Sequence, residues 1–380
     1  MPNVFELSSI VARDAAIELR SSLKAAGVMP GKHTQTFAQK VGQKIDVKVR
    51  PLMTAKRHTG SGAFDTSDIN EVSVPVEIAY RAYIKHKLTA QEKTFSVDDF
   101  ALQVVRPAMI ALAEDIDLFL VHSVLAPGFA RNIAGTDGAS PSTLAHLAAA
   151  WKVLFDNKAT NGICTGLINS TAAGAFLQLA QLTSKDYGDE RPRALANAMF
   201  STVYNMDIYP VQSASVIDRG DIAGTVTTDG VIALAATSVG MKAFTAATGY
   251  IRRGTRFTIA GDTTVYTVTE TTAIAANAAA AVPVYPAIAA QSGNDALITF
   301  KAAAQENVVF NPDATAKVII APEPQWGNPS SVGVFEGLSV RTTFESSIND
   351  ATHGDGEWVL FDTFVGGQVL VPECGVLLQG

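Results

Sequence analysis

Residues 96–125 carry an apolar stripe that constrains the fold of this chain more than any other stretch. Its large apolar side chains recur at spacings of three and four residues: Leu102, Val105, Met109, Leu112, Ile116 and Phe119. This period places them on one face of an α-helix, whereas a strand would alternate at every second residue. Such a helix is roughly 40 Å long, and Pro107 is expected to kink it or to mark a restart. The stretch predicts a long spine helix with these six side chains as its core face.

Two β-prone runs precede the spine and predict a long hairpin. Residues 44–50 alternate apolar and charged side chains over one strand length, and residues 72–88 return in the same way. A polar, glycine-containing tip, residues 54–70, separates them. An isolated hairpin is marginal in water, and no helix close in sequence is placed to cover this one. We therefore expect the hairpin to lie on a neighbouring copy of the chain.

The hairpin tip is polarised in charge. Its outgoing side carries the cationic or titratable residues Lys56, Arg57 and His58. Its returning side carries the acidic residues Asp65, Asp68 and Glu71. A solvated loop is one explanation of this pattern. The other is charge complementarity with a second copy, which would set the register of the contact more than its affinity.

The rest of the chain mixes helices and strands. An amphipathic helix over residues 4–26 precedes any domain, and we interpret it as an arm. Helices at residues 142–158 and 170–182 lead to a strand at residues 203–211. From about residue 218 to about 307 the chain is rich in Thr, Ala, Val and Gly, which predicts a small all-β insertion, a barrel or a sandwich. Closing strands are expected at residues 317–321, 338–344, 357–364 and 368–378.

Composition narrows the class of function. The chain has 380 residues, of which 47% are hydrophobic and 17% charged, so it can bury a core and is not disordered. Its net charge of −7 disfavours charge-driven DNA binding, because proteins of that kind are normally basic. Residues 271–290 are uncharged but mostly alanine, with two prolines, which predicts a packed loop or strand and no membrane span. The first twenty residues lack the apolar centre of a signal peptide.

No group of residues indicates catalysis. The neighbouring acids at residues 98–99 and 114–117 point to different faces of a helix, so they form no acid–base pair. The six histidines are scattered, and Cys164 and Cys374 form no pattern typical of zinc or disulfide frameworks. Residues 60–62, Gly-Ser-Gly, lack the setting of a nucleophile elbow or a phosphate loop. The sequence predicts no catalytic, cofactor-binding or metal-binding residue, and no enzyme.

Six short motifs accompany this order of elements. They lie in the return strand of the hairpin, before and on the spine, and in the closing strands: 69–76 (INEVSVPV), 95–100 (FSVDDF), 106–109 (RPAM), 337–341 (GLSVR), 361–366 (FDTFVG) and 371–373 (VPE). Together with the element order, they resemble the major capsid proteins of tailed bacteriophages, in the coat-protein branch with an extra β insertion. That family commonly has Leu-Tyr-Gly where this chain has residues 364–366, Phe-Val-Gly. The insertion is similar in position and β character and not in residues.

The resemblance implies an α+β chain with the Hong Kong 97-like capsid fold, in six parts. These are an N-terminal arm (1–35), an E-loop hairpin with flanking strands (36–90), a peripheral domain with the spine helix (91–140), an axial domain (141–222), a β-rich insertion domain (223–308) and return strands (309–380). The arm and the hairpin would lie across neighbouring copies. The implied function is a coat protein that self-assembles as pentamers and hexamers into an icosahedral shell around the double-stranded DNA of a tailed bacteriophage.

The resemblance also implies partners and a location. The partners are the chain itself, a scaffolding protein during assembly and a portal protein, with a decoration protein as an open addition. The DNA would be enclosed without sequence-specific binding, and no cofactor or membrane is involved. Shells would assemble in the host cytoplasm and form the capsid of the virion. Two alternatives stay open: a shell protein of a bacterial nanocompartment with the same fold, and a soluble enzyme with an all-β accessory domain.

Overall fold

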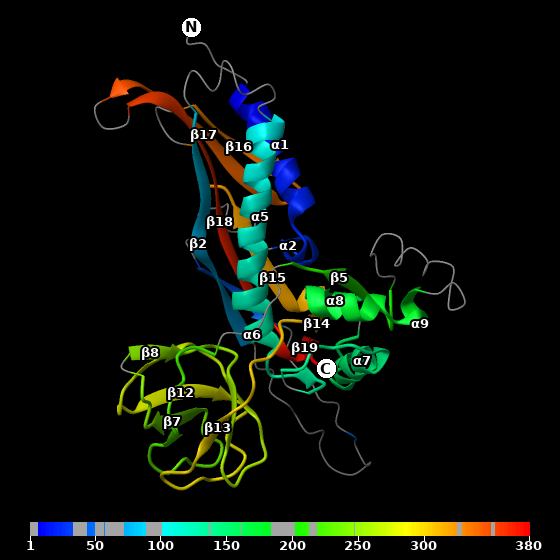
Figure 1. Cartoon of the computed structure of the whole chain (residues 1–380), viewed down its shortest axis with the longest axis vertical. Coiled ribbons are helices and arrows are strands. Elements are labelled where there is room, and N and C mark those ends of the chain that lie inside the picture. The colour runs from blue at the N-terminus through cyan, green and yellow to red at the C-terminus, as the bar shows by residue number, and fades with distance from the viewer. Residues whose placement is uncertain are drawn as a thin grey trace.

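A computed structural model describes most of the chain: residues 7–32, 44–49, 57, 72–88, 101–136, 138–160, 162–183, 202–212, 219–246, 248–324, 329–350 and 354–380. An elongated body of helices laid on a six-stranded sheet carries a smaller α/β part beside its lower end and a β-rich unit below (Figure 1). Within these ranges, no helix is long and apolar enough to cross a membrane.

The spine is a continuous helical stretch along the body (Figure 1). Its successive segments are η1 (Ala101–Val105) and η2 (Leu120–Leu125), both π-helical, with α5 (Arg106–Phe119) between them and α6 (Ala126–Phe129) after them. Pro107 lies in the first turn of α5. Because proline lacks the N–H that a regular preceding turn would need, the wider turns of η1 are a natural accommodation. The sequence-predicted helix is therefore present from residue 101, with wider turns at both ends of α5; residues 96–100 lie outside the described residues.

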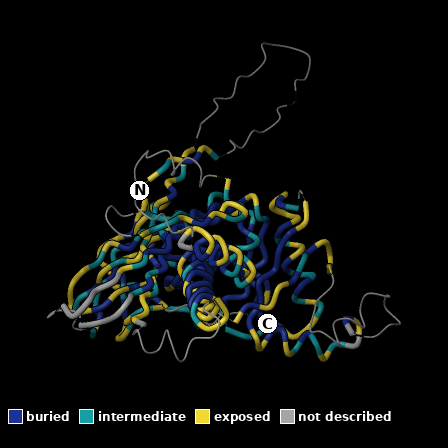
Figure 2. The backbone as a smooth tube through the Cα atoms, turned by 90° about the horizontal axis from the view of Figure 1, so that it is seen from above, coloured by how far each residue is buried: buried dark blue, intermediate teal, exposed yellow. Residues whose placement is uncertain are grey.

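Four of the six side chains predicted for the core face are buried: Val105, Met109, Leu112 and Ile116. They lie in the largest apolar core, which follows the spine (Figure 2). Phe119 is partly buried and meets the ring of Tyr80 edge-on, with ring centroids 4.9 Å apart. Leu102 is 57% exposed, which corrects the prediction. The wider turns of η1 rotate Leu102 off the stripe that regular α-helical spacing would give.

The sheet of the body joins strands from distant parts of the chain. Its order is β1 (Lys44–Val49), β2 (Val72–Leu88), β18 (Gly354–Val369), β17 (Leu338–Asp350) and β16 (Ser330–Phe335), with β15 (Thr315–Ile320) also paired to β18; all pairs are antiparallel. The predicted hairpin is present as β1 and β2. However, β2 is covered within its own chain and not by a neighbouring copy. It pairs with β18, and its side chains Tyr80, Ala82 and Ile84 pack in the spine core. The strand that pairs with β2 lies far along the sequence, so the residues close to the hairpin do not indicate it.

The N-terminal helix belongs to the core of its own chain. α1 (Leu7–Ser22) packs on α5, β16 and β17, and α2 (Ala25–Val28) follows it. Val11, Ala15 and Leu19 are buried in the same core as the spine. The interpretation of residues 1–35 as an arm that precedes any domain is therefore corrected for residues 7–29: their apolar face is covered within the same chain, and only the exposed face is left for a neighbouring copy. The amphipathic pattern correctly predicts the helix, but the spine and the sheet of the same chain cover the apolar face of that helix.

The backbones of α1 and the sheet meet at Gly333 of β16. A Cβ added at Gly333 would lie 1.8 Å from the carbonyl oxygen of Ala12, so a larger residue forces the two elements apart. We expect Gly333→Ala to lower the free energy of unfolding by about 1–3 kcal/mol, measured by urea denaturation. The matched control is Gly174→Ala in α8 (Ser170–Leu177), where an added Cβ meets nothing within 4 Å. The control should gain up to about 1 kcal/mol in helix propensity; equal responses of the two variants would contradict the close approach.

A buried carboxylate and a buried ammonium group hold the turn between α1 and α2. Asp117 of α5 accepts hydrogen bonds from the backbone N–H groups of Lys24 (2.7 Å) and Ala26 (3.0 Å). Lys317 of β15 donates to the carbonyl oxygen of Ala26. Burial raises the pKa of Asp117, and burial, reinforced by Arg20, lowers the pKa of Lys317 to about 8. The start of α2 is thus fixed both to the spine and to the sheet.

Lys317 gives the stability of the chain a pH dependence of definite sign. Its pKa of about 8 in the folded chain lies below the ordinary value of 10.5. Between these pH values the unfolded chain binds more protons, so the free energy of unfolding rises with pH across this window, by at most about 3 kcal/mol. We expect Lys317→Met to lose this rise, measured by urea denaturation at pH values below and above the window. An identical pH dependence in both proteins would contradict the burial of the ammonium group.

A smaller α/β part lies beside the lower end of the spine (Figure 1). Its sheet runs in the order β3 (Ile133–Ala134), β19 (Gly375–Leu378), β14 (Val308–Phe310), β4 (Cys164–Ile168) and β5 (Met206–Pro210). α7 (Leu144–Asp156) and α8 contribute to a second apolar core with this sheet, and the short α9 (Ala180–Thr183) follows α8. Leu167, Val308 and Phe310 belong to the spine core instead, so this sheet is buried on both faces. The predicted helices at 142–158 and 170–182 and the strand at 203–211 correspond to α7, α8 with α9, and β5.

The β-rich unit has a core of its own, which includes Phe244, Phe257 and Tyr266. Its strands are β6 (Thr227–Thr228), β7 (Ser238–Lys242), β8 (Thr248–Ile251), β9 (Arg256–Ile259), β10 (Tyr266–Val268), β11 (Thr272–Ala275), β12 (Ala280–Tyr285) and β13 (Ile298–Phe300). They form a six-stranded sheet and a two-stranded ribbon of β8 and β11. The alanine-rich residues 271–290 contain β11 and β12, in line with the packed loop or strand predicted there. Gly254 lies against Pro127 of α6, where the unit meets the body.

Candidate functional site

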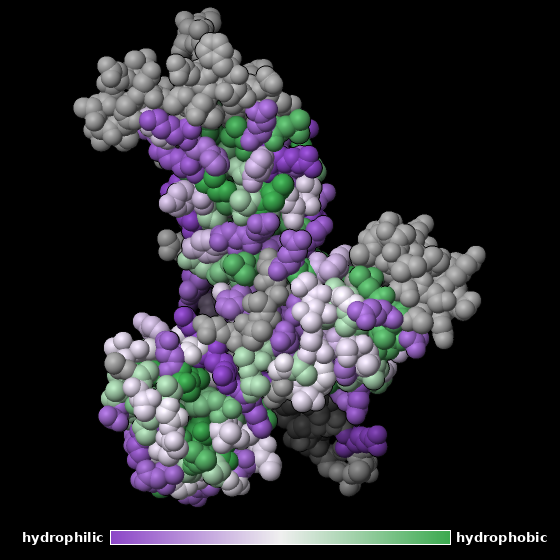
Figure 3. Space-filling view, viewed as in Figure 1, coloured by the Kyte–Doolittle hydropathy of each residue, from purple (hydrophilic) through white to green (hydrophobic). Residues whose placement is uncertain are grey.

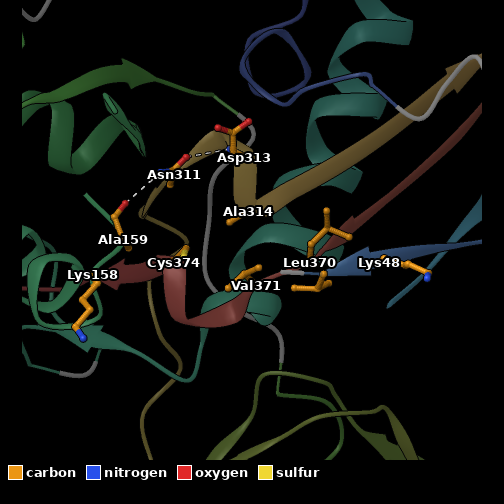
Figure 4. A pocket seen from close by; sticks show the side chains of 10 residues that line it. Lys48, Lys158, Ala159, Asn311, Asp313, Ala314, Leu370, Val371 and Cys374 are labelled. Carbon is orange, nitrogen blue, oxygen red and sulfur yellow. Dashed lines mark hydrogen bonds between the residues drawn. The ribbon is translucent and has the colours of Figure 1, made fainter. Parts of the chain in front are cut away.

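The pocket in Figure 4 is small and is built by turns. It encloses about 280 Å³ and is lined by residues from β1, the turn after α7, the segment between β14 and β15, and η5 (Pro372–Cys374). Asn311 donates to the carbonyl oxygen of Ala159 (3.1 Å) and accepts from the backbone N–H of Asp313 (3.0 Å). Lys48 and Lys158 lie at opposite ends of the pocket (Figure 4). Its polar groups thus hold turns together and do not converge on a point where a substrate could react.

One histidine–carboxylate contact lies on the spine. His122 Nδ1 of η2 contacts a carboxylate oxygen of Glu306, whose side chain is fully buried. Neither residue lines the pocket in Figure 4. Across the ranges that the structure describes, no group of three or more His, Cys, Asp or Glu side chains is arranged to hold a metal ion. The contact joins η2 to the segment before β14.

Among the described residues, five large apolar side chains of α1 and the spine are exposed. We call them the exposed strip, which consists of Ile10, Ile17, Leu102, Ile110 and Leu118; they are 55%, 37%, 57%, 40% and 46% exposed. The two helices pack side by side, and Figure 3 shows apolar patches between hydrophilic ones over them. Arg106 and Glu18 connect them across 3.9 Å. An apolar patch with a polar rim is typical of a surface that another protein covers, which makes the exposed strip a candidate contact surface.

A buried ion cluster holds three strands of the body together. Asp362 of β18 is fully buried and lies between arginines from both neighbouring strands. Arg341 of β17 donates to its two oxygens from Nε (2.9 Å) and Nη2 (2.7 Å). Arg81 of β2 donates from Nε (2.6 Å), and its Nη2 contacts the same oxygen. Two charge-assisted pairs on one carboxylate fix the lateral order of the strands that carry the spine.

A second uncovered apolar surface lies on α7. Trp151 and Phe155 stack with ring centroids 5.0 Å apart and are 37% and 55% exposed. Their opposite side of the helix, with Leu147, Ala150 and Leu154, is buried in the second core. Exposed aromatic pairs are frequent anchors in protein interfaces. The α/β part thus offers an aromatic contact surface separate from the exposed strip.

The structure describes only part of the predicted hairpin tip. Arg57 is exposed, which fits both explanations of the charge pattern. The other predicted contact residues lie outside the described residues: Lys56, His58, Asp65, Asp68 and Glu71. Sequence reasoning missed the Asp362 cluster and the exposed strip. The signal for the cluster is a charged residue inside an apolar strand, as at Asp362 after Phe361. The exposed strip has no such signal, because its residues look like any other apolar positions of a helix.

Comparison with solved structures gives distant relatives over nearly the whole chain. A structure of Mycobacterium phage Che8 covers 93% of this chain and 90% of its own, with 14% identity and a TM-score of 0.50. A structure of Microbacterium phage Oxtober96 covers 94% and 90%, with 10% identity and a TM-score of 0.48. The capsid structure of the cyanophage P-SCSP1u covers 88% and 83%, with 12% identity and a TM-score of 0.44. No protein-family model and no curated protein matches the chain.

The likeness to the Che8 structure concerns the fold. It covers 93% of the chain. The chain has the α+β Hong Kong 97-like capsid fold of tailed bacteriophages, with an additional β-rich unit. The expected fold class is thereby confirmed.

Proposed function

We propose that this chain is a major capsid protein that self-assembles, as pentamers and hexamers, into an icosahedral shell around the double-stranded DNA of a tailed bacteriophage. The observation that carries the proposal is the exposed strip on a chain with the capsid fold. Several large apolar side chains exposed on one pair of packed helices favour a surface that another protein covers. Another copy is the simplest cover, because shells of this fold are built from many copies of one chain. We further propose that the chain catalyses no reaction.

The same proposal extends to partners and location. A scaffolding protein would guide assembly and a portal protein would occupy one vertex, with a decoration protein as an open addition. The shell would assemble in the cytoplasm of the bacterial host and become the capsid of the virion. The net charge of −7 fits a wall that encloses DNA without sequence-specific contacts, because 36 acidic residues outnumber 29 basic ones and disfavour overall attraction to phosphates.

Electron microscopy of the expressed chain tests this function. We expect closed shells, with or without a co-expressed scaffolding protein from the same genome. The matched variant is Ile110→Asp, which places a charge in the exposed strip at a residue that is 40% exposed. It should fold but form no shells, because a carboxylate would be buried in the contact. A monomer or small oligomer of the unchanged chain under both conditions would overturn the function; normal shells of Ile110→Asp would remove the strip from the contact.

We also propose that the hairpin tip touches a second copy, through Lys56, Arg57 and His58 on one side and Asp65, Asp68 and Glu71 on the other. The pattern supports charge complementarity that fixes register. Changing Lys56 and Arg57 together to glutamate should impair shell formation and leave thermal unfolding of the subunit unchanged. Normal shells from this double variant would mean that Lys56 and Arg57 belong to a solvated loop and make no contact that assembly needs.

A further inference from the structure

A groove of about 1010 Å³ lies where the β-rich unit meets the body. Its walls are formed by β1 and β2 of the hairpin, by Arg131 after α6, by the segment that joins β10 to β11, and by the chain from the end of β18 into η5. Its polar lining includes Arg131, Arg253, Thr269, Gln368 and Asn157. The groove adjoins the pocket of Figure 4, and the two share Val49, Leu370, Val371 and Cys374 as lining residues, but neither arginine lines that pocket.

Arg131 is held in place through the face of its guanidinium group. The guanidinium carbon lies 3.9 Å from the ring centroid of Tyr285, the last residue of β12. Stacking of this kind occupies the flat face and leaves the N–H groups at the edge free to donate. In the part of the chain that the structure describes, these N–H groups have no hydrogen-bond acceptor and no ion pair.

Arg253 lies beside it, partly buried against α6. Its Nη2 lies 3.5 Å from the position that a Cβ at Gly128 would take, so the guanidinium group rests on the helix backbone. The backbone N–H of Arg253 donates to Thr271 Oγ1 (3.2 Å), but no described residue accepts from its guanidinium group. Burial and the neighbouring Arg131 lower the pKa of Arg253, since both disfavour its charge. Glu270 favours that charge from a distance without forming an ion pair.

This arrangement differs from three cations of the body sheet. Arg341 and Arg81 share Asp362, and Lys317 donates to a backbone carbonyl oxygen. Two neighbouring guanidinium groups without acceptors leave up to ten N–H donors in a groove that is open to solvent. Glu270 and Glu373 also line the groove, so total charge alone does not define it. What the site lacks is a compact group with several acceptor oxygens between the two arginines.

We propose that the groove is an oxyanion-binding site that takes a phosphate-like dianion between Arg131 and Arg253. Guanidinium groups bind such anions in a bidentate manner, and a dianion relieves the repulsion between the two cations. The hydroxyl of Thr269 and the amide of Gln368 can donate to the remaining oxygens. Because the site contacts the β-rich unit, α6 and β18, the bound anion would tie the unit to the body. The proposal does not depend on shell formation.

Titration of the full chain with inorganic phosphate tests the site. We expect saturable binding by isothermal titration calorimetry, and a thermal midpoint that is higher in phosphate than in chloride at equal ionic strength. Arg253→Gln and, independently, Arg131→Gln should weaken binding at least about tenfold, as expected for loss of charge-assisted hydrogen bonds. Arg13→Gln is the matched control: it removes an exposed arginine of α1 and should bind like the unchanged chain.

Phosphate also stabilises proteins without binding to a site, by exclusion from their surface. Only the difference between the arginine variants and Arg13→Gln therefore counts. If all four proteins gain the same midpoint in phosphate and none shows saturable heat, the proposal is overturned. If Arg253→Gln does not fold, the phosphate affinity of Arg131→Gln alone tests the proposal. Arg131 stacks on Tyr285 and makes no hydrogen bond to a described residue, so its replacement should leave the fold intact.

Discussion

Replacing Met109 with aspartate is expected to leave no cooperatively folded chain. Met109 is fully buried in the core formed by α1, the spine and the sheet, so the new carboxylate would have neither water nor a cation. An unpaired buried charge costs several kcal/mol even after the surroundings relax, which approaches the whole stability of a typical domain, about 5–15 kcal/mol. The variant should appear in the insoluble fraction, and any soluble material should show no cooperative thermal transition by circular dichroism.

The neighbouring residue supplies the control. Ile110→Asp is the same kind of change one position along the same helix, but Ile110 is 40% exposed and its carboxylate would stay in water. This variant should melt within a few degrees of the unchanged chain, since exposed substitutions usually change stability by no more than about 0.5 kcal/mol. If Met109→Asp melted like Ile110→Asp, the core face of the spine would be wrongly assigned.

Removing the carboxylate of Asp362 is expected to destabilise the chain by about 3–5 kcal/mol. Asp362→Ala leaves Arg341 buried, with only the carbonyl oxygen of Glu323 as an acceptor for Nη1 (2.6 Å). It also frees Arg81, whose side chain is 41% exposed and can turn to water. The dominant cost is therefore the uncompensated charge of Arg341. Urea denaturation of the unassembled chain measures the effect.

A surface ion pair in the same sheet is the control for Asp362. Lys85 and Glu345 lie 3.2 Å apart, with side chains that are 43% and 50% exposed. Breaking this pair with Glu345→Gln should cost at most about 1 kcal/mol, because water screens exposed charges. Similar losses for Asp362→Ala and Glu345→Gln would show that the cluster is solvated and not buried.

Periodicity alone recovered the spine and its core face. Val105, Met109, Leu112 and Ile116 repeat at three and four residues, and a helical stretch of regular geometry puts such residues on one side. The same rule failed at Leu102, because it assumes a constant number of residues per turn and η1 has wider turns. Local sequence therefore gives the face of a helix only where its geometry is regular.

The partners of the hairpin and of α1 could not be predicted from neighbouring residues. The alternation in residues 72–88 correctly indicates a strand, but nothing in it identifies β18 as the strand that pairs with it. Similarly, α1 looks like a free amphipathic helix until β16 and the spine are placed beside it. Long-range pairing depends on the whole chain, and a local pattern carries no information about it.

The candidate surfaces show the same limit. Ile110 and Met109 are adjacent apolar residues in the sequence, yet one lies in the exposed strip and the other in the core. Arg131 and Arg253 are far apart in the sequence and meet only because the β-rich unit packs on α6. Sites that depend on which faces are left uncovered require the tertiary structure.

The pairing of β2 with β18 has a consequence for the timing of synthesis. As the chain leaves the ribosome, α1, β2 and the spine emerge long before β18, residues 354–369. Until β18 emerges, one edge of β2 has no strand paired to it, and unpaired strand edges of this kind make a nascent chain prone to aggregate. Closing the long loop between β2 and β18 is slow compared with local helix formation. The body sheet therefore forms only after residue 369 has been synthesised, and each copy must reach that point before it can present a rigid surface to another.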